Sequence, residues 1–278
     1  MDAVVAKPFE AFEKTLSRRD SIVKLFDTHS HLEMPRLYQK ADKIVCRAKE
    51  VGVIGVVVSA IEPKFYQKAL DLKKRFPGYI WPTFGLHPPR ATPQMVNRTV
   101  KTIRDYAGEI VAIGEVGLDY YWVKDSKERD YQKTAFVEFI HLAEELSLPL
   151  VVHSREAEED AIQILLEQRM SEVQLHCFND PQNVRQAVEA KFFMSVPTSV
   201  VSRQRMQHIA KEMPLENMLL ETDAPYLSPV PKQTNEPANL PQSAVKIAEI
   251  KSTTPETIAA TTTSNALNFL HLQDVYTG

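Results

Sequence analysis

Histidine and carboxylate side chains follow several short apolar runs of this sequence, where they could bind metal ions. They are His29, His31, Glu115, His153, His176 and Asp223. Imidazole nitrogens and carboxylate oxygens are common ligands of divalent cations. Residues two apart in an extended strand share a face, so His29 and His31 can chelate one cation. Because a His-x-His pair does not by itself indicate a metal site, the prediction depends on whether the other four side chains converge with it.

The number and type of these side chains indicate which chemistry they would perform. Four histidines and two carboxylates are too many for one tetrahedral metal but suit two cations that share a carboxylate. A paired-metal centre can activate water, orient it for in-line attack and stabilise the departing oxygen, which suits phosphodiester hydrolysis. The sequence therefore predicts two divalent metal ions, and the donor set would accept zinc, manganese, cobalt or magnesium.

The elements that must position these residues are eight short runs with the composition of β-strands. The runs are Lys24–Thr28, Val53–Ala60, Tyr79–Gly85, Val111–Gly114, Leu148–Val152, Glu172–Leu175, Lys191–Val196 and Met218–Thr222. Amphipathic stretches such as Gln132–Leu146 lie between successive runs. This alternation predicts an α/β fold with a parallel sheet, whose strands are covered on both faces.

A closed barrel is the form of parallel sheet that the sequence favours. The count of eight strands, without a Gly-x-Gly-x-x-Gly turn, favours a TIM-type (β/α)8 barrel over a doubly wound sheet. Enzymes of this fold carry their chemistry at the carboxyl ends of the strands. Each polar residue alone could be a satisfied polar group or a helix cap. Together they predict a metal site at the C-terminal ends of the strands.

Length and composition set limits on the domain organisation. The 278 residues are 44% hydrophobic and 25% charged, as in ordinary soluble globular proteins. We predict a single hydrolase barrel domain over 24–278, preceded by an N-terminal extension over 1–23 that is helical and has no assigned role. The net charge of −3 gives no bulk attraction to nucleic acid, so a polyanionic partner needs a local patch or bound cations.

The location and partners are predicted from the cysteines and the apolar runs. Cys46 and Cys177 are too few for a disulfide framework, which favours a reducing, cytoplasmic location. No run approaches the length of about 20 apolar residues that a membrane span needs. We therefore predict no membrane partner and no obligate protein partner. Cys177 itself is predicted to be a small buried hydrophobe on a strand.

A set of short motifs carries a resemblance to a known family. The motifs are 27–32 (DTHSHL), 85–88 (GLHP), 114–119 (GEVGLD), 149–155 (PLVVHSR), 176–178 (HCF), 221–227 (ETDAPYL) and 235–237 (NEP). In this order and combination the sequence resembles the TatD family of metal-dependent deoxyribonucleases, which are amidohydrolase-like metallohydrolases. Members of that family act on DNA, often from the 3′ end.

The resemblance implies a role for each of the six side chains. His29, His31 and Asp223 would hold one metal, and His153 and His176 would hold the other. Glu115 would bridge both metals, and Asp223 would also act as the general base. The sequence departs from the family pattern at Pro89, which puts one substrate contact in doubt, and at Glu33, where the family usually has Asp and the surroundings of the ligands can differ.

Further residues could contact the substrate or orient the ligands. Arg155 could grip a phosphate, or else pair with Glu156 or Glu159. His87 at the third strand end could bind substrate, or else make a structural hydrogen bond. The aromatic residues at 120–122 could stack unpaired bases, although lid packing is the commoner use. Glu221, Asp27 and Asp119 could orient a ligand histidine, or else form a salt bridge or a loop cap.

Two alternatives compete with a 3′–5′ exonuclease that cleaves phosphodiester bonds. A barrel hydrolase of the same geometry could act on an ester, lactone, amide, phosphotriester or aminoacyl-tRNA bond. Such enzymes often bridge their metals with a carboxylated lysine, whereas Glu115 stands in that register here. The second alternative is a binding scaffold without catalysis, which would be expected to have lost ligands. All six are present, so the sequence favours the nuclease.

Overall fold

A single parallel sheet organises residues 23–276, which are the part of the chain that the computed structural model describes. Its strands are β1 (Leu25–Ser30), β2 (Val53–Ala60), β3 (Ile80–Phe84), β4 (Ala112–Asp119), β5 (Leu150–Arg155), β6 (Val173–Leu175), β7 (Phe193–Pro197) and β8 (Met218–Glu221). They pair in chain order, each parallel to the next. The helix predicted over 1–23 lies outside the described residues, apart from Val23.

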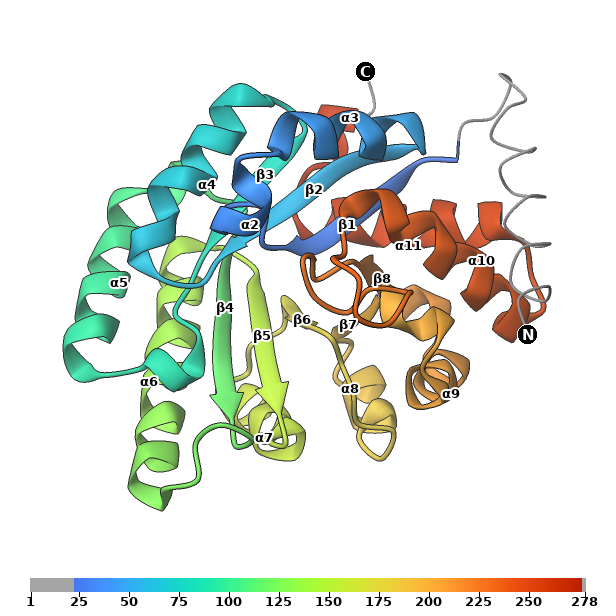
Figure 1. The fold of residues 1–278 in the computed structure, drawn as a ribbon. Helices are drawn as coiled ribbons and strands as arrows, with labels where there is room; N and C mark the ends of the chain where they lie inside the picture. The colour runs from blue at the N-terminus through green and yellow to red at the C-terminus, as the bar shows by residue number, and fades with distance from the viewer. Residues whose placement is uncertain (1–22, 277–278) are drawn as a thin grey trace.

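Helices lie between successive strands and after β8, around the outside of the sheet (Figure 1). They are α2 (Pro35–Tyr38), α3 (Ala41–Glu50), α4 (Pro63–Arg75), α5 (Pro93–Asp105), α6 (Ser126–Leu146), α7 (Glu158–Glu167), α8 (Val184–Glu189), α9 (Gln204–Glu212), α10 (Leu240–Lys251), α11 (Pro255–Phe269) and α12 (Gln273–Tyr276). Short 3-10 turns are η1 (Pro88–Arg90), η2 (Ala107–Glu109), η3 (Thr198–Val201), η4 (Leu215–Asn217) and η5 (Pro237–Asn239). The alternation of strand and helix confirms the predicted α/β class.

The first and last strands approach each other and nearly close the sheet into a barrel. A parallel bridge joins Ser30 to Ala224, and the amide of Asp223 donates to the carbonyl of His29 at 2.8 Å. The hydroxyl of Thr28 donates to the carbonyl of Leu220 at 3.0 Å. The structure thus confirms the TIM-type barrel, and this seam brings two predicted metal-binding segments together.

Strands β4 and β5 are longer than the sequence predicts. The apolar runs were expected to end at Gly114 and Val152, but both strands continue and pair as far as Asp119 and Arg155. Gly117 permits this pairing, because a Cβ there would lie 2.2 Å from the carbonyl oxygen of His153, and its φ of +134° disfavours side chains. Two of the proposed metal ligands, Glu115 and His153, therefore sit inside rigid strands and not in loops.

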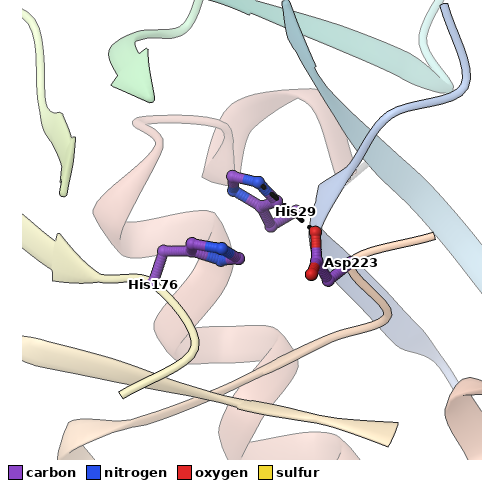
Figure 2. Close-up of side chains that lie close together, drawn as sticks. All are labelled: His29, His176 and Asp223. Atoms are coloured by element: carbon purple, nitrogen blue, oxygen red, sulfur yellow. Dashed lines mark ion pairs between the residues drawn. The ribbon is translucent and has the colours of Figure 1, made fainter. Parts of the chain in front are cut away.

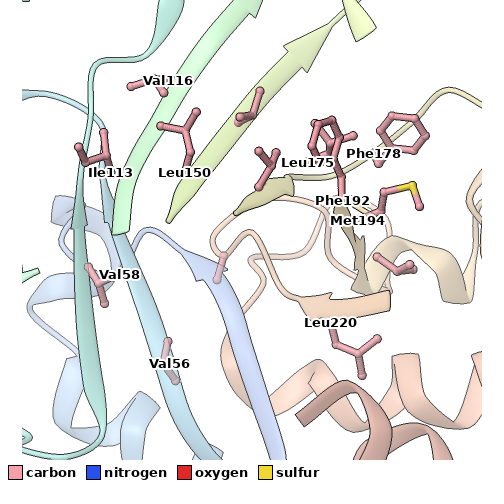
Figure 3. Close-up of a cluster of buried hydrophobic side chains, with 14 of the residues drawn as sticks. Val56, Val58, Ile113, Val116, Leu150, Leu175, Phe178, Phe192, Met194 and Leu220 are labelled. Atoms are coloured by element: carbon pink, nitrogen blue, oxygen red, sulfur yellow. The ribbon is translucent and has the colours of Figure 1, made fainter. Parts of the chain in front are cut away.

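Alternate strand residues fill two hydrophobic clusters. One cluster lies against the surrounding helices and includes Val56, Val58 and Leu150 (Figure 3). The other takes Val57 from the opposite face of β2 and packs it with Phe269 and neighbouring residues near the end of the chain. Because both faces of the strands are buried, the strands are held firmly and can position the side chains at their ends.

Candidate metal centre

All six predicted ligands converge at the C-terminal ends of the strands. His29 comes from β1, Glu115 from β4 and His153 from β5, whereas His31, His176 and Asp223 follow β1, β6 and β8. Figure 2 shows His29, His176 and Asp223 facing one another across the end of the sheet. Elements that are distant in sequence therefore supply one compact group of donors.

The first half of the group surrounds one oxygen of Glu115. Its Oε2 lies 3.3 Å from Nε2 of His29 and 3.7 Å from Nε2 of His31. Asp223 faces the same two rings, with its Oδ1 at 3.3 Å from Nε2 of His31 and 4.0 Å from Nε2 of His29. Two imidazoles and two carboxylates thus enclose one space that could hold a cation.

The second half surrounds the other oxygen of Glu115. Its Oε1 lies 2.6 Å from Nδ1 of His153, 3.9 Å from Nε2 of His176 and 3.8 Å from Nε2 of His87. Glu115 is almost fully buried between the two sets of imidazoles. The carboxylate therefore presents one oxygen to each set, which is the arrangement that a bridging ligand requires.

The unsatisfied donors and acceptors test whether a cation fits these residues. Three overlapping groups have ligand atoms within 4.8 Å of one another; they are His29–His176–Asp223, His29–His31–Glu115 and His87–Glu115–His153. Nε2 of His29 is buried and has no hydrogen-bond partner among the described residues. Leaving a buried nitrogen unpartnered costs free energy, and a divalent cation would satisfy it. The residues present therefore fit a metal site.

One nitrogen of each ligand imidazole is held by a group outside the centre. Nδ1 of His29 meets the hydroxyl of Ser59 at 3.2 Å, and Nδ1 of His31 meets the carbonyl of Ser59 at 2.8 Å. Ser59, at the end of β2, did not stand out in the sequence, although it is a polar residue within an apolar run. It fixes two rings so that both direct Nε2 toward the carboxylates.

The remaining two imidazoles are held by buried carboxylates. Nδ1 of His176 lies 2.9 Å from Oε2 of Glu221, and Nε2 of His153 lies 3.0 Å from Oδ2 of Asp119. These contacts match the predicted orienting roles of Glu221 and Asp119. Asp27 differs, because it accepts from the amide of Thr222 at 2.9 Å and its hydroxyl at 2.6 Å and contacts no ligand imidazole ring. Asp27 therefore fastens β1 to the end of β8.

The electrostatics favour ionised carboxylates at the centre. Burial by itself would raise the pKa of Glu115, but His176, His153 and His29 outweigh it and hold the pKa well below its usual value. Burial would likewise raise the pKa of Asp223, but His31 and His176 outweigh burial and lower the pKa below its usual value. Both carboxylates are therefore ionised at neutral pH and can bind a cation.

His87 sits beside the centre as an uncharged imidazole. Burial, followed by the positive charge of His153, lowers the pKa of His87 to about 4. Its ring lies 4.5 Å from that of His153, centroid to centroid, and lines the pocket over the proposed metal ligands. Structural hydrogen bonding was the alternative role, but the structure gives the ring no hydrogen bond to the described residues. The ring is therefore available to a bound molecule.

A pocket of about 560 Å³ opens above the ligands. Arg155 lines it, together with Trp122, Arg203 and Tyr226. Arg155 forms no ion pair with Glu156 or Glu159 within residues 23–276, and Glu156 instead pairs with Lys124 at 3.3 Å. The pocket thus brings positively charged and aromatic side chains to the proposed metal ligands.

The position of Cys177 differs from the one that the sequence predicts. It was predicted to be a buried hydrophobe on a strand, but β6 ends at Leu175 and Cys177 occupies the turn that follows. Its φ of +46° turns the chain, and the partly exposed residue lines the pocket. The short run at the sixth strand did not indicate where extended pairing would stop.

The eightfold barrel, with histidines and carboxylates gathered at its strand ends, has the architecture of a metal-dependent hydrolase. The sequence identifies the family within this class of hydrolases, since the family model for TatD related DNase matches residues 26–271. The chain belongs to this TatD family, as its motifs predicted. Across residues 23–276 there is no helix with the length and hydrophobicity to span a membrane.

Curated relatives match over nearly their whole lengths. The human deoxyribonuclease TATDN3 is 34% identical over 257 residues, which cover 88% of this chain and 94% of the relative. A 3′-5′ ssDNA/RNA exonuclease TatD from Erwinia tasmaniensis is 33% identical, and the match covers 89% of this chain and 100% of the relative. An uncharacterized metal-dependent hydrolase of Bacillus subtilis, YabD, is 34% identical, and the match covers 87% of this chain and 97% of the relative.

Solved structures share the fold. A TatD family hydrolase from Entamoeba histolytica superposes with a TM-score of 0.82 at 18% identity, covering 91% of this chain and all of that one. A TatD homologue from Escherichia coli gives a TM-score of 0.81 at 23% identity, covering 90% and 98%. At these identities the likeness supports the barrel architecture alone.

Proposed function

We propose that this protein is a metal-dependent deoxyribonuclease that cleaves phosphodiester bonds from the 3′ end of DNA. The observation that carries the proposal is the position of Glu115, whose Oε2 faces His29 and whose Oε1 faces His153. Relatives named as a deoxyribonuclease and as a 3′-5′ exonuclease for single-stranded DNA and RNA support the choice of substrate. DNA, or another phosphodiester, is therefore the proposed partner.

The proposed ligand assignment is the one that the resemblance to the TatD family implies. His29, His31 and Asp223 would hold one divalent cation, His153 and His176 would hold the other, and Glu115 would contact both. Nitrogen and oxygen donors of this kind accept zinc, manganese, cobalt or magnesium. When bound, the cations would supply Lewis acidity and positive charge that offset the negative charge of a phosphodiester.

Residues of the chain itself would then bind the substrate and move the proton. The Asp223 carboxylate lines the pocket and stays ionised, so we assign to it the general-base role of accepting a proton from the attacking water. Arg155 would hold a non-bridging phosphate oxygen, and uncharged His87 would bind the substrate by hydrogen bonding. The pocket walls would orient the scissile bond over the metal ligands.

Hydrolysis of labelled oligonucleotides tests the proposal. A 5′-labelled single-stranded DNA would be incubated with chelator-treated, manganese-loaded and magnesium-loaded protein, and with metal-loaded Asp223→Asn protein. We expect stepwise shortening from the 3′ end that requires metal and Asp223. No cleavage of this DNA by the metal-loaded parent would contradict the proposal and would favour an ester, lactone, amide or aminoacyl-tRNA bond as the substrate.

The domain boundaries and location belong to the same proposal. We propose that residues 24–278 form one hydrolase domain, since the family model spans 26–271 and strands from β1 to β8 share one sheet. The two cysteines are free, which fits a reducing cytoplasmic location. Expression of the chain from residue 21 onward should retain metal-dependent cleavage, and cell fractionation would test the location.

A further inference from the structure

The segment after β4 exposes two aromatic rings at the mouth of the pocket. Trp122 is 65% exposed and Tyr121 is 40% exposed, and their rings meet edge to face at 4.9 Å between centroids. Trp122 lines the pocket. Side chains that pack a lid bury their rings, so this degree of exposure does not fit the lid-packing role that was the alternative.

Arg155 lies against the same aromatic rings. Its guanidinium carbon is 3.7 Å from the centroid of the Tyr121 ring and 5.9 Å from that of the Trp122 ring. Within residues 23–276 no carboxylate pairs with it. Stacking on an aromatic face holds a guanidinium in place while leaving its N–H groups free, so Arg155 can donate to a phosphate.

One carboxylate ties this rim to the metal centre. Oδ1 of Asp119 accepts from the backbone amide of Trp122 at 2.8 Å, and Oδ2 of the same residue contacts Nε2 of His153 at 3.0 Å. The guanidinium of Arg129 also donates to the carbonyls of Tyr120 and Val123, at 3.1 and 2.8 Å. The backbone that carries the exposed rings is therefore held next to a proposed metal ligand.

We propose that Trp122, with the Arg155–Tyr121 pair, forms a subsite for one unpaired nucleotide next to the scissile phosphate. The indole face stacks on the base, and the Arg155 guanidinium binds the adjoining phosphate. A base inside a duplex has both faces covered by its neighbours, so the subsite selects a single-stranded end. This inference rests on the proposed function, because it specifies which form of nucleic acid reaches the metal centre.

Fluorescence of Trp122 tests the stacking directly. The chain has two tryptophans, Trp122 and Trp81. Trp81 is partly buried and donates to the hydroxyl of Tyr276. In Trp81→Phe protein all tryptophan fluorescence therefore comes from Trp122. Metal-loaded protein would be titrated with a phosphorothioate-linked hexathymidylate, which resists hydrolysis. We expect saturable quenching of the Trp122 emission, because a stacked base quenches indole fluorescence.

Matched variants measure what the ring contributes to affinity. In a background that keeps Trp81, Trp122→Ala should weaken hexathymidylate binding about tenfold or more. Tyr106→Ala removes another exposed aromatic residue, at the end of α5 and outside the pocket, and should change the affinity less than twofold. The parent should lose most of its affinity when the terminal base is replaced by an abasic sugar, whereas Trp122→Ala protein should bind both oligomers equally.

The outcomes separate this inference from the proposed function. Unquenched Trp122, or equal binding by the parent and Trp122→Ala protein, would overturn the subsite even if the protein cleaves DNA. Quenching and a loss of affinity would support it even if no cleavage were observed, because neither measurement requires hydrolysis. A parent that prefers blunt duplex over a single-stranded end would also overturn it.

Discussion

Glu221 and His176 lie on opposite sides of β7, and the carboxylate reaches across to hold the imidazole. Oε2 of Glu221 lies 2.9 Å from Nδ1 of His176 and also accepts a hydrogen bond from the hydroxyl of Ser195 on β7 at 2.5 Å. Both partners of this contact are buried. The pair therefore fixes which nitrogen of His176 faces Glu115, and replacement of Glu221 should weaken metal binding.

We expect Glu221→Gln to lower metal affinity by about 10- to 100-fold, as is common when the partner of a ligand histidine is lost. Competition with a chromophoric chelator measures the affinity. Glu172→Gln is the matched control, because Glu172 also contacts a histidine, His271, at 3.0 Å on the surface. Equal affinities in the two variants would show that the Glu221 contact does not support the site.

The two ligand sets predict different metal contents for two conservative variants. Asp223 belongs to one set, whereas Glu115 contacts both. We expect two metal ions per chain in the parent, about one in Asp223→Asn protein and close to none in Glu115→Gln protein. Elemental analysis after gel filtration measures the content. Loss of both metals from Asp223→Asn protein would contradict the prediction that the two ligand sets bind their metals independently.

Removal of metal should lower the thermal stability of the parent. A cation that binds only the folded chain stabilises it by about 2.7 kcal/mol when its free concentration is 100 times Kd. Differential scanning calorimetry with and without chelator measures the shift in Tm. Glu115→Gln protein serves as the control and should show little shift. A parent Tm that is independent of metal would argue against binding at these ligands.

Loss of the guanidinium at position 155 should weaken substrate binding. Hydrogen bonds to charged groups contribute about 1.5–3 kcal/mol, so Arg155→Ala should reduce kcat/KM on DNA by about 10- to 100-fold. Arg155→Lys should recover only part of the loss, since lysine cannot bind bidentately or stack on Tyr121 in the same way. Steady-state kinetics on a single-stranded oligonucleotide measures both.

An exposed arginine outside the pocket provides the control for this comparison. Arg185 on α8 has a side chain that is 89% exposed and pairs with Glu189. Arg185→Ala should leave kcat/KM within about twofold of the parent, because exposed ion pairs of this kind contribute little. A decrease in kcat/KM as large as that of Arg155→Ala would indicate that the loss of any positive charge lowers activity, whether or not the residue lines the pocket.

The close approach of β4 and β5 should make Gly117 intolerant of a side chain. A Cβ there would meet the carbonyl oxygen of His153 at 2.2 Å, whereas at Gly108 no atom of residues 23–276 would lie within 4 Å of it. We expect Gly117→Ala to lower the free energy of unfolding by about 2 kcal/mol or more, and Gly108→Ala to change it by less than about 0.5 kcal/mol. Urea unfolding of chelated protein measures both, and equal stabilities would contradict the steric argument.

Much of the fold and of the ligand group could be predicted because the signals are local. β-branched runs bounded by turn residues marked eight strands, and the parallel order follows from the helices between them. Polar residues after apolar runs identified side chains such as His29 and Asp223. The predicted ends of β4 and β5 were wrong, because pairing between these strands continues past glycine and polar residues that usually end a strand.

The sequence by itself determined the type of donors, their order along the chain and the edge of the sheet where they would meet. The tertiary structure decided which imidazole nitrogen faces inward, that Asp119 contacts both His153 and Trp122, and that Arg155 lies on Tyr121 and not on a neighbouring glutamate. These contacts depend on register and rotamer, which are set by residues on other strands. No local pattern encodes them, because their partners are brought together only when the barrel forms.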